Sequence, residues 1–213
     1  MRDKAKDAAE KSRRMKLAME SGFRLFSERG IETVKMSDIA QDCGLSRQSL
    51  YRYFSTKTDM VVAIGTWKWK EFITDYISRV PPEKPDELTA ADRMRLYLDA
   101  FIDMYRNYKD ILRYNYYFNS FLANNQSVPE QKQSYTDVVA NMKKAFHWLY
   151  EKGQKDGTLR RDIPESVMFA SSFHIMLAAV TRYAMGLIYV EDEDDPEREL
   201  VLLKELLFLG YVM

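Results

Sequence analysis

Between residues 46 and 57 the sequence concentrates side chains that can donate hydrogen bonds to a nucleic acid. The stretch reads SRQSLYRYFSTK. Arginine and glutamine can bind base edges, whereas hydroxyl, phenol and ammonium groups suit phosphate oxygens. Leu50 and Phe54 are four residues apart and would share the buried face of a short helix, so Tyr51 and Tyr53 would point largely outward. The residue types therefore predict a helix that presents polar groups to a nucleic acid.

The residues before this helix predict that it is the second half of a helix-turn-helix. Ile39 and Ala40 give the preceding helix a core residue and a small residue where a neighbour can cross closely. Gly44 permits a sharp turn and Leu45 fills the corner, while Ser46 can cap the free amides of the next helix. In such a motif the N-terminal half of the second helix enters the major groove of DNA.

The segment GFRLFSERGIETVKMSDIAQDCGLSRQSLYRYFSTKTDM resembles the DNA-binding domain of the TetR/AcrR family of bacterial regulators. The resemblance covers about residues 14–62, and the remaining 150 or so residues match only in helix number and length. A lone helix-turn-helix would lack the Tyr-x-Tyr-Phe-x-x-Lys ending, which makes the match specific. The motifs that carry it are Leu25-Phe26, Gly30, Asp38-Ile39-Ala40, Gly44-Leu45-Ser46 and Leu50-Tyr51-x-Tyr53-Phe54-x-x-Lys57.

The resemblance implies a role in DNA binding for each of several residues. Lys35 stands where the family usually has Thr or Ser, so it cannot cap a helix through an oxygen, although its ammonium can reach a phosphate. Base or groove contacts are implied for Arg47, Gln48 and Ser49, and phosphate contacts for Tyr51, Tyr53 and Lys57. The expected DNA-binding set is Lys35, Ser46, Arg47, Gln48, Ser49, Tyr51, Tyr53 and Lys57.

The simpler readings of these positions are structural. Tyr51 would then only pack, and Lys57 would be a solvated lysine. Arg52 fits a solvated neighbour better than a base reader. Cys43 fits inert packing better than redox sensing, which needs exposure and a lowered pKa.

Charge and composition narrow the class of protein. The 213 residues have zero formal net charge, but residues 1–57 carry 13 Lys/Arg against 8 Asp/Glu, a local excess of five positive charges. A basic end on a neutral chain is a localised electrostatic footprint. One cysteine and two histidines make a dedicated metal site improbable, and we expect no cofactor. The charged N-terminus MRDKAKDAAEKSRR is no secretory signal, so we expect a cytoplasmic protein.

The hydrophobic pattern predicts an all-α fold of about nine helices. We expect an N-terminal three-helix DNA-binding domain at 1–56 and a larger ligand-binding and dimerisation domain at 57–213. Gly30 should end the first helix, because glycine tolerates left-handed geometry. Two short helices then flank Gly44. The later helices are expected at about 57–80, 88–107, 109–124, 128–155, 163–190 and 196–212.

The second domain is rich in Tyr, Phe and Met, most of all in residues 94–118. Such stripes are ordinarily core, but adaptable methionines and phenol hydroxyls also suit a small-molecule cavity between helices. The family resemblance implies such a cavity. Its expected wall is Trp67, Phe72, Phe101, Tyr105, Tyr117, Met142, Phe146 and Met176.

Residues 167–190 are apolar on every face, which predicts burial all round. A membrane span is one reading, opposed by His174 and Arg182 inside the run and by the lack of a second span. The other reading is a helix between the ligand-binding core and a subunit interface, and the resemblance implies a homodimer through residues 163–212. Leu200, Leu203, Leu206 and Leu207 supply an apolar stripe on the last helix.

These observations favour a homodimeric regulator, most often a repressor in this family, that binds a pseudo-palindromic operator and a bulky apolar or aromatic effector. An architectural DNA-binding protein without a ligand is the first alternative. An all-α enzyme is the second, but the sequence offers no nucleophile–base pair and no glycine-rich phosphate loop.

Overall fold

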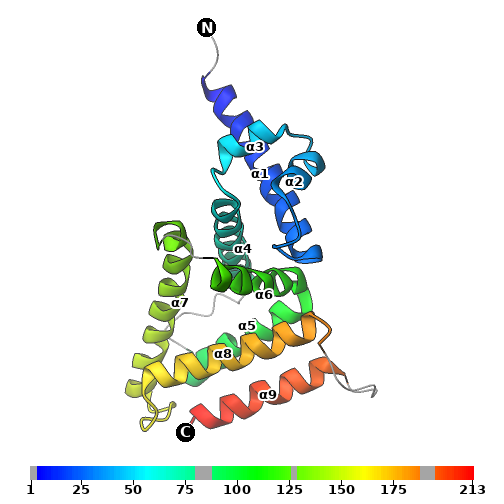
Figure 1. Cartoon of the computed structure of the whole chain (residues 1–213). Coiled ribbons are helices and arrows are strands. Elements are labelled where there is room, and N and C mark those ends of the chain that lie inside the picture. Colours follow the sequence, from blue (N-terminus) through cyan, green and yellow to red (C-terminus); the bar gives the residue numbers. More distant parts are fainter. Residues whose placement is uncertain (1–3, 80–87, 126–128, 188–194) are drawn as a thin grey trace. The chain divides into compact units, whose positions relative to one another are not determined.

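The computed structural model describes residues 4–79, 88–125, 129–187 and 195–213, and these residues form an all-α fold, which confirms the predicted fold class (Figure 1). By the contacts between residues the chain divides into two compact units. The first unit is Met1–Trp69 with Arg113–Thr136, and the second is Lys70–Leu112 with Asp137–Met213. The described helices are α1 (Lys4–Arg29), α2 (Met36–Asp42), α3 (Arg47–Tyr53), α4 (Lys57–Arg79), α5 (Ala90–Asn107), α6 (Lys109–Asn124), α7 (Pro129–Asp156), α8 (Glu165–Ala184) and α9 (Pro196–Tyr211).

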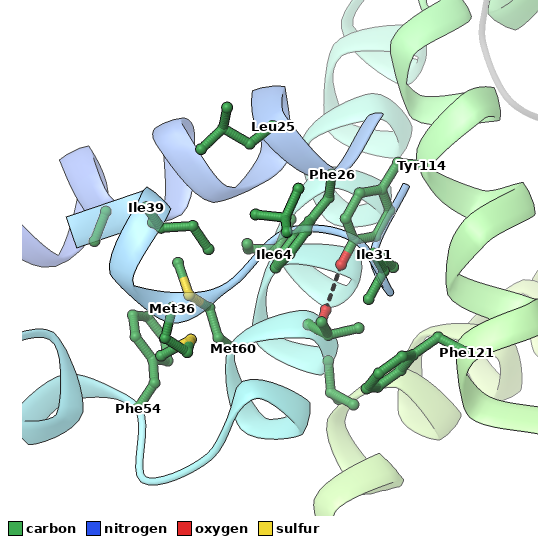
Figure 2. Close-up of a cluster of buried hydrophobic side chains, with 14 of the residues drawn as sticks. Leu25, Phe26, Ile31, Met36, Ile39, Phe54, Met60, Ile64, Tyr114 and Phe121 are labelled. Atoms are coloured by element: carbon green, nitrogen blue, oxygen red, sulfur yellow. Dashed lines mark hydrogen bonds between the residues drawn. The ribbon is translucent and has the colours of Figure 1, made fainter. Parts of the chain in front are cut away.

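A single hydrophobic core organises the first unit (Figure 2). Phe26 from α1, Ile39 from α2, Leu50 from α3, and Met60 and Ile64 from α4 are all fully buried in it. Helices α2 and α3 have seven residues each, too few to be stable alone, so this shared core must hold them in place.

Helix α6 contributes aromatic side chains to the same core. The buried Tyr114 hydroxyl donates a hydrogen bond of 2.6 Å to the carbonyl oxygen of Val61 in α4 (Figure 2). Phe118 and Phe121 are almost fully buried beside it. Where α1 ends, Gly30 has a φ of +84°, and a Cβ there would lie 3.2 Å from the Tyr117 ring. The predicted helix end at Gly30 is therefore confirmed, and the same glycine lets α6 approach closely.

Helices α5, α8 and α9 pack against one another in the second unit. Lys204 of α9 is mostly buried, and its ammonium lies 2.6 Å from Asp99 of α5 and 3.0 Å from Glu205. Arg95 of α5 reaches Glu205 at 2.7 Å. A buried ammonium needs such compensation, so these pairs fix the register of α9 along α5.

Helix α8 ends earlier than the sequence predicted. The expected helix ran to residue 190, but α8 ends at Ala184 because Gly186 takes a φ of +70°. The amide of Gly186 then donates to the carbonyl of Tyr183, and the amide of Leu187 to that of Arg182. This is a left-handed helix ending of the kind that glycine favours. Residues 188–190 lie outside the described part of the chain.

In the single chain α8 is buried on part of its surface only, and the subunit interface expected to cover the rest stays a prediction. Met168, Met176 and Val180 are buried, whereas Val167 is 52% and Ile175 41% exposed. Among the described residues, α8 is the one helix whose length and apolar composition would allow it to cross a membrane. Its packing against α5 and α9 gives it the contacts of a core helix that keeps one apolar face open.

The predicted domain boundary between residues 56 and 57 concerns function and stays a prediction. By contacts alone, α4 from Lys57 to Trp69 and most of α6 belong with the helix-turn-helix. The element that would read DNA and a large part of α6 therefore share one hydrophobic core.

Candidate nucleic-acid interface

The turn between α2 and α3 has the geometry that its sequence predicts. Gly44 has a φ of +66°. The amide of Leu45 donates to the carbonyl of Ala40 at 2.9 Å, which closes α2. The Ser46 hydroxyl accepts the amide of Ser49 at 3.1 Å, which caps α3. These local predictions are confirmed.

Helix α3 buries its apolar side chains against the core and exposes most of its polar ones. Leu50 is fully buried and Phe54 is 5% exposed. Tyr51 is 39% exposed, and the guanidinium of Arg47 lies 5.8 Å from the centre of its ring. Such cation–π stacking restricts Arg47 without using its hydrogen-bond donors. Ser46, Arg47, Gln48 and Arg52 are exposed, while Ser49 is half-buried.

Two residues of α3 have additional roles. The Ser49 hydroxyl lies 2.9 Å from that of Ser46 and accepts a hydrogen bond of 3.3 Å from the Arg52 guanidinium. Tyr53 is half-buried and packs against the hydrophobic core. The sequence predicted it to point outward, and the structure gives its ring a packing role as well.

Lys35 begins α2 as a residue without a side-chain cap, as expected from its lack of an oxygen acceptor. Its backbone amide donates to the carboxylate of Asp38 at 2.9 Å. The Lys35 side chain itself is exposed. It therefore remains available to an anion, and its role as a phosphate contact stays a prediction.

The Lys57 side chain has contacts within its own unit, and its role as a phosphate contact stays a prediction. Lys57 is half-buried, and its ammonium lies 3.5 Å from the carbonyl oxygen of Glu32. The ring centres of Phe26 and Phe121 are 6.0 and 5.8 Å away. Burial lowers the pKa of Lys57, although the charges of Glu32 and Asp38 oppose that shift.

A polar cluster that the sequence analysis missed ties α2 to α1. The Asp42 carboxylate accepts a hydrogen bond of 2.6 Å from the Ser21 hydroxyl, and it pairs with the Arg24 guanidinium. Asp42 ends α2, where a negative charge opposes the helix dipole, so it needs these partners. The Ser21 hydroxyl and then Arg24 lower the pKa of Asp42. The contact spans about 20 positions, so no local sequence pattern could have revealed it.

The residues predicted to line an effector cavity are divided between the two units, and their role stays a prediction. Trp67 and Tyr117 belong to the first unit, and the other six belong to the second. Phe101, Phe146 and Met176 are buried, and Met142 is half-buried. Phe72 lies against Tyr76 and Tyr108, while Tyr105 lies near Tyr183.

Phe101 and Phe146 belong to an aromatic cluster formed by α5, α7 and α8. The ring of Tyr97 meets Phe101 at 5.5 Å and Phe146 at 5.2 Å between centres. Phe169 and Phe173 of α8 extend the cluster, at 5.3 Å from Phe146 and 5.9 Å from Phe101. Burial raises the pKa of the Tyr97 phenol, so this hydroxyl stays protonated. The sequence analysis did not include Phe169 or Phe173, although their four-residue spacing on an apolar helix is a signal for a shared face.

In the described part of the chain, no group of three or more His, Cys, Asp or Glu side chains is placed to hold a metal ion. Cys43 is half-buried, and burial raises the pKa of its thiol. A raised thiol pKa opposes thiolate chemistry.

Known proteins resemble the chain in two different ways. The sequence model of "Bacterial regulatory proteins, tetR family" matches residues 18–64. An HTH-type transcriptional regulator of Staphylococcus aureus (strain MRSA252) is 29% identical over 108 residues, which is 51% of this chain and 55% of the relative. Another from S. aureus (strain bovine RF122 / ET3-1) is 34% identical over 71 residues, 33% of this chain and 37% of the relative. The chain thus spans between a third and somewhat over half of the length of these curated relatives.

Solved structures resemble the fold over nearly the whole chain. A transcriptional regulator from Saccharomonospora viridis in complex with choline has a TM-score of 0.72 at 16% identity, covering 95% of this chain and 99% of that one. The regulator FadR from Bacillus subtilis in complex with stearoyl-CoA has a TM-score of 0.68 at 17% identity, covering 91% and 97%. At these identities the likeness is one of fold.

The Asp42 cluster yields a prediction about stability and pH. Replacing Asp42→Asn should lower the midpoint of thermal unfolding at pH 7 by about 2–4 °C, because the paired carboxylate is lost. The folded-state pKa of Asp42 is lowered, so its contribution is present above the unfolded pKa of about 4 and is lost as the pH falls through the folded pKa. The difference between the unfolding midpoints of wild type and variant should therefore narrow as the pH falls below about 4.

Glu28→Gln is the matched control, because Glu28 meets the same Arg24 at 3.4 Å on the exposed surface. Thermal unfolding followed by circular dichroism at pH 7, 5 and 2.5 measures all three proteins. Two results would contradict a stabilising role of the Asp42 carboxylate. One is an unfolding midpoint of Asp42→Asn equal to that of wild type at pH 7, and the other is a difference in midpoint at pH 2.5 as large as that at pH 7.

Proposed function

Since the chain belongs to the TetR family of bacterial regulatory proteins through its N-terminal domain, we propose that it is a homodimeric transcriptional regulator that binds operator DNA. It acts as a repressor, and a bulky, largely apolar or aromatic molecule releases it from the operator. The observation that supports this most directly is the polar face of α3, held outward by a buried core directly after the Gly44 turn.

The proposed readers are at the N-terminal half of α3. Arg47 and Gln48 are exposed there and can each make paired hydrogen bonds to base edges in the major groove. We assign Tyr51, Tyr53 and the Ser46 cap to contacts with the sugar–phosphate backbone. Phosphate contacts fix position and orientation but carry no sequence information.

We expect selection from random DNA to yield an inverted repeat. Two α3 helices of a symmetric dimer must meet major-groove faces about one helical turn apart, ~34–36 Å, or a multiple of it. Selection followed by sequencing measures this directly. Recovery of sequences without two-fold symmetry would count against the proposal.

Two variants separate reading from positioning on the selected operator. Arg47→Ala should relax the preference at one base pair, where a correct contact is worth roughly 1–3 kcal/mol. Tyr53→Phe should weaken binding to every operator variant by a similar factor. Binding isotherms on a panel of operators with single-base substitutions make the comparison. If Arg47→Ala lost equal affinity for specific and random DNA, Arg47 would contact phosphate and not bases.

The proposed dimer forms through the open apolar faces of α8 and α9. Leu202, Leu206 and Leu209 of α9 are 61%, 60% and 67% exposed in the single chain, and they share one helical face. Of the stripe expected from sequence, Leu206 is exposed, and Leu203 and Leu207 are half-buried. Leu200 instead belongs to the core of its own chain, because it is only 1% exposed.

Leu206→Glu should give a monomer with poor operator affinity. The side chain is exposed in the single chain, so the substitution should leave the protomer folded, while an unpaired charge buried at the interface costs roughly 3–5 kcal/mol. Ile77→Glu in α4 is the matched control, because Ile77 is 65% exposed outside these two helices. Sedimentation velocity and operator titration measure both, and a dimeric, operator-competent Leu206→Glu would place the interface elsewhere.

The proposed effector site is the aromatic cluster of the second unit, around Tyr97, Phe101 and Phe146. Aromatic faces suit an apolar or aromatic molecule, and they also suit a cation through cation–π attraction. The two similar structures described above were solved with choline and with stearoyl-CoA. Those ligands differ in class, so the support from them extends to small-molecule binding and not to one compound.

An effector found by screening should weaken operator binding by the same factor by which operator DNA weakens effector binding. Met142→Trp should fill the effector site and so abolish the effect of the effector on operator binding, while operator binding itself stays nearly intact. Ala145→Trp adds the same ring at an exposed position of α7 and should respond normally. Calorimetric titration of the effector with and without operator DNA measures this coupling between the two binding events. Effectors that bind with the same affinity in both cases would favour the architectural alternative.

A further inference from the structure

The N-terminal turns of α1 extend beyond the part of the chain that the family model matches. That match begins at residue 18, whereas α1 begins at Lys4. Residues 6–17 are exposed throughout except for the half-buried Glu10. They carry five Lys/Arg against two Asp/Glu. We call residues 6–17 the α1 extension.

The face of α1 that packs on the core becomes charged in this extension. Ala18, Leu25 and Phe26 are buried on that face. Steps of four and seven residues back from Ala18 lead to Arg14 and Lys11, which share its side of the helix. The extension therefore presents cations on the side where the rest of α1 presents apolar groups.

These cations and the end of α3 line one open groove of about 620 Å³. Figure 1 shows the N-terminal part of α1 passing beside α3. The groove meets α3 at its last two residues, so it adjoins the end of α3 where Tyr53 is proposed to contact phosphate. Its lining residues are Asp7, Glu10, Lys11 and Arg14 from α1, and Arg52 and Tyr53 from α3.

Three cations and two carboxylates face this groove, and one carboxylate is already neutralised. Glu10 accepts hydrogen bonds from Arg13 at 2.9 Å and from Arg14 at 2.7 Å. Arg13 and then Arg14 lower the pKa of Glu10 to about 2. Arg14 shares Glu10 with Arg13, which adds a further positive charge from outside the lining, so the three groove cations still outnumber the two carboxylates.

We propose that this groove holds the sugar–phosphate backbone of DNA that flanks the base pairs read by α3. Lys11, Arg14 and Arg52 supply the cations, and the Tyr53 hydroxyl supplies a neutral donor at the junction with α3. The α1 extension thereby lengthens the footprint of each half-site without adding base recognition. This inference rests on the proposed operator binding and adds a second contact region to it.

The test replaces both groove cations of the extension, Lys11→Gln with Arg14→Gln. The matched control is Lys6→Gln with Lys16→Gln, which removes the same charge from the opposite side of the helix. Operator titrations over a range of salt concentrations use two duplexes, one with natural flanks and one trimmed to the base pairs read by α3. Far-ultraviolet circular dichroism checks that the extension stays helical.

On the flanked duplex the groove variant should lower the slope of log K against log salt by roughly one to two, since each phosphate contact contributes about 0.9. The control should change it much less, and on the trimmed duplex the two variants should behave alike. Asp7→Asn should act in the opposite direction and tighten binding to the flanked duplex, because it removes a carboxylate from the groove.

Equal changes in the salt slope for the groove variant and its control would overturn the inference, because the overall positive charge of the α1 extension would then explain both. Equal losses on flanked and trimmed duplexes would also overturn it. In both outcomes the wild type still binds a symmetric operator, and the proposed function stands. Failure of the wild type to select any operator would instead refute the proposed function itself.

Discussion

The proposed DNA-reading surface depends on one constraint, which is that two seven-residue helices cannot persist without a shared core. Leu50 of α3 and Ile39 of α2 are fully buried against Phe26, Met60 and Ile64, so each short helix is held by its neighbours. The exposure of Arg47 and Gln48 follows from that burial, because a helix pinned by one face must turn its other face outward. The Asp42 cluster adds a polar tie to the same assembly. If α3 binds the operator as proposed, a substitution in this core should change operator binding although the replaced residue does not contact DNA.

Features whose causes lie within a few residues could be predicted from the sequence. Gly30 and Gly44 take the left-handed geometry that their positions require, and Ser46 caps α3 with its own hydroxyl. The all-α fold and most helix boundaries follow from the same kind of information, because caps, prolines and apolar spacing act locally. The late end predicted for α8 was wrong because the apolar run continues past Gly186, whereas the left-handed backbone of that glycine ends the helix.

Features that depend on distant partners could not be predicted. The sequence gives no sign that the ammonium of Lys57 meets the carbonyl of Glu32, 25 positions away, or that Phe121 of α6 lies close to it. Apolar spacing shows which face of a helix is buried but not which helix covers it. For that reason Phe101 and Phe146 were expected together, whereas Phe169 and Phe173, which complete their cluster, were not.

The placement of Lys57 bears on how a distant ligand could influence DNA binding. Its ammonium joins the loop after α1, the start of α4 and the aromatic side of α6 within one unit, and burial already lowers its pKa. Helix α4 also has residues in both units, from Lys57 to Trp69 in the first and from Lys70 onward in the second. An effector bound in the second unit can act on operator affinity only by its differential affinity for two arrangements of the elements it touches. A shift of α4 or α6 would strain the contacts that hold Lys57. Effector binding and operator binding could therefore be coupled through packed helices, without any side chain that contacts both the effector and the DNA.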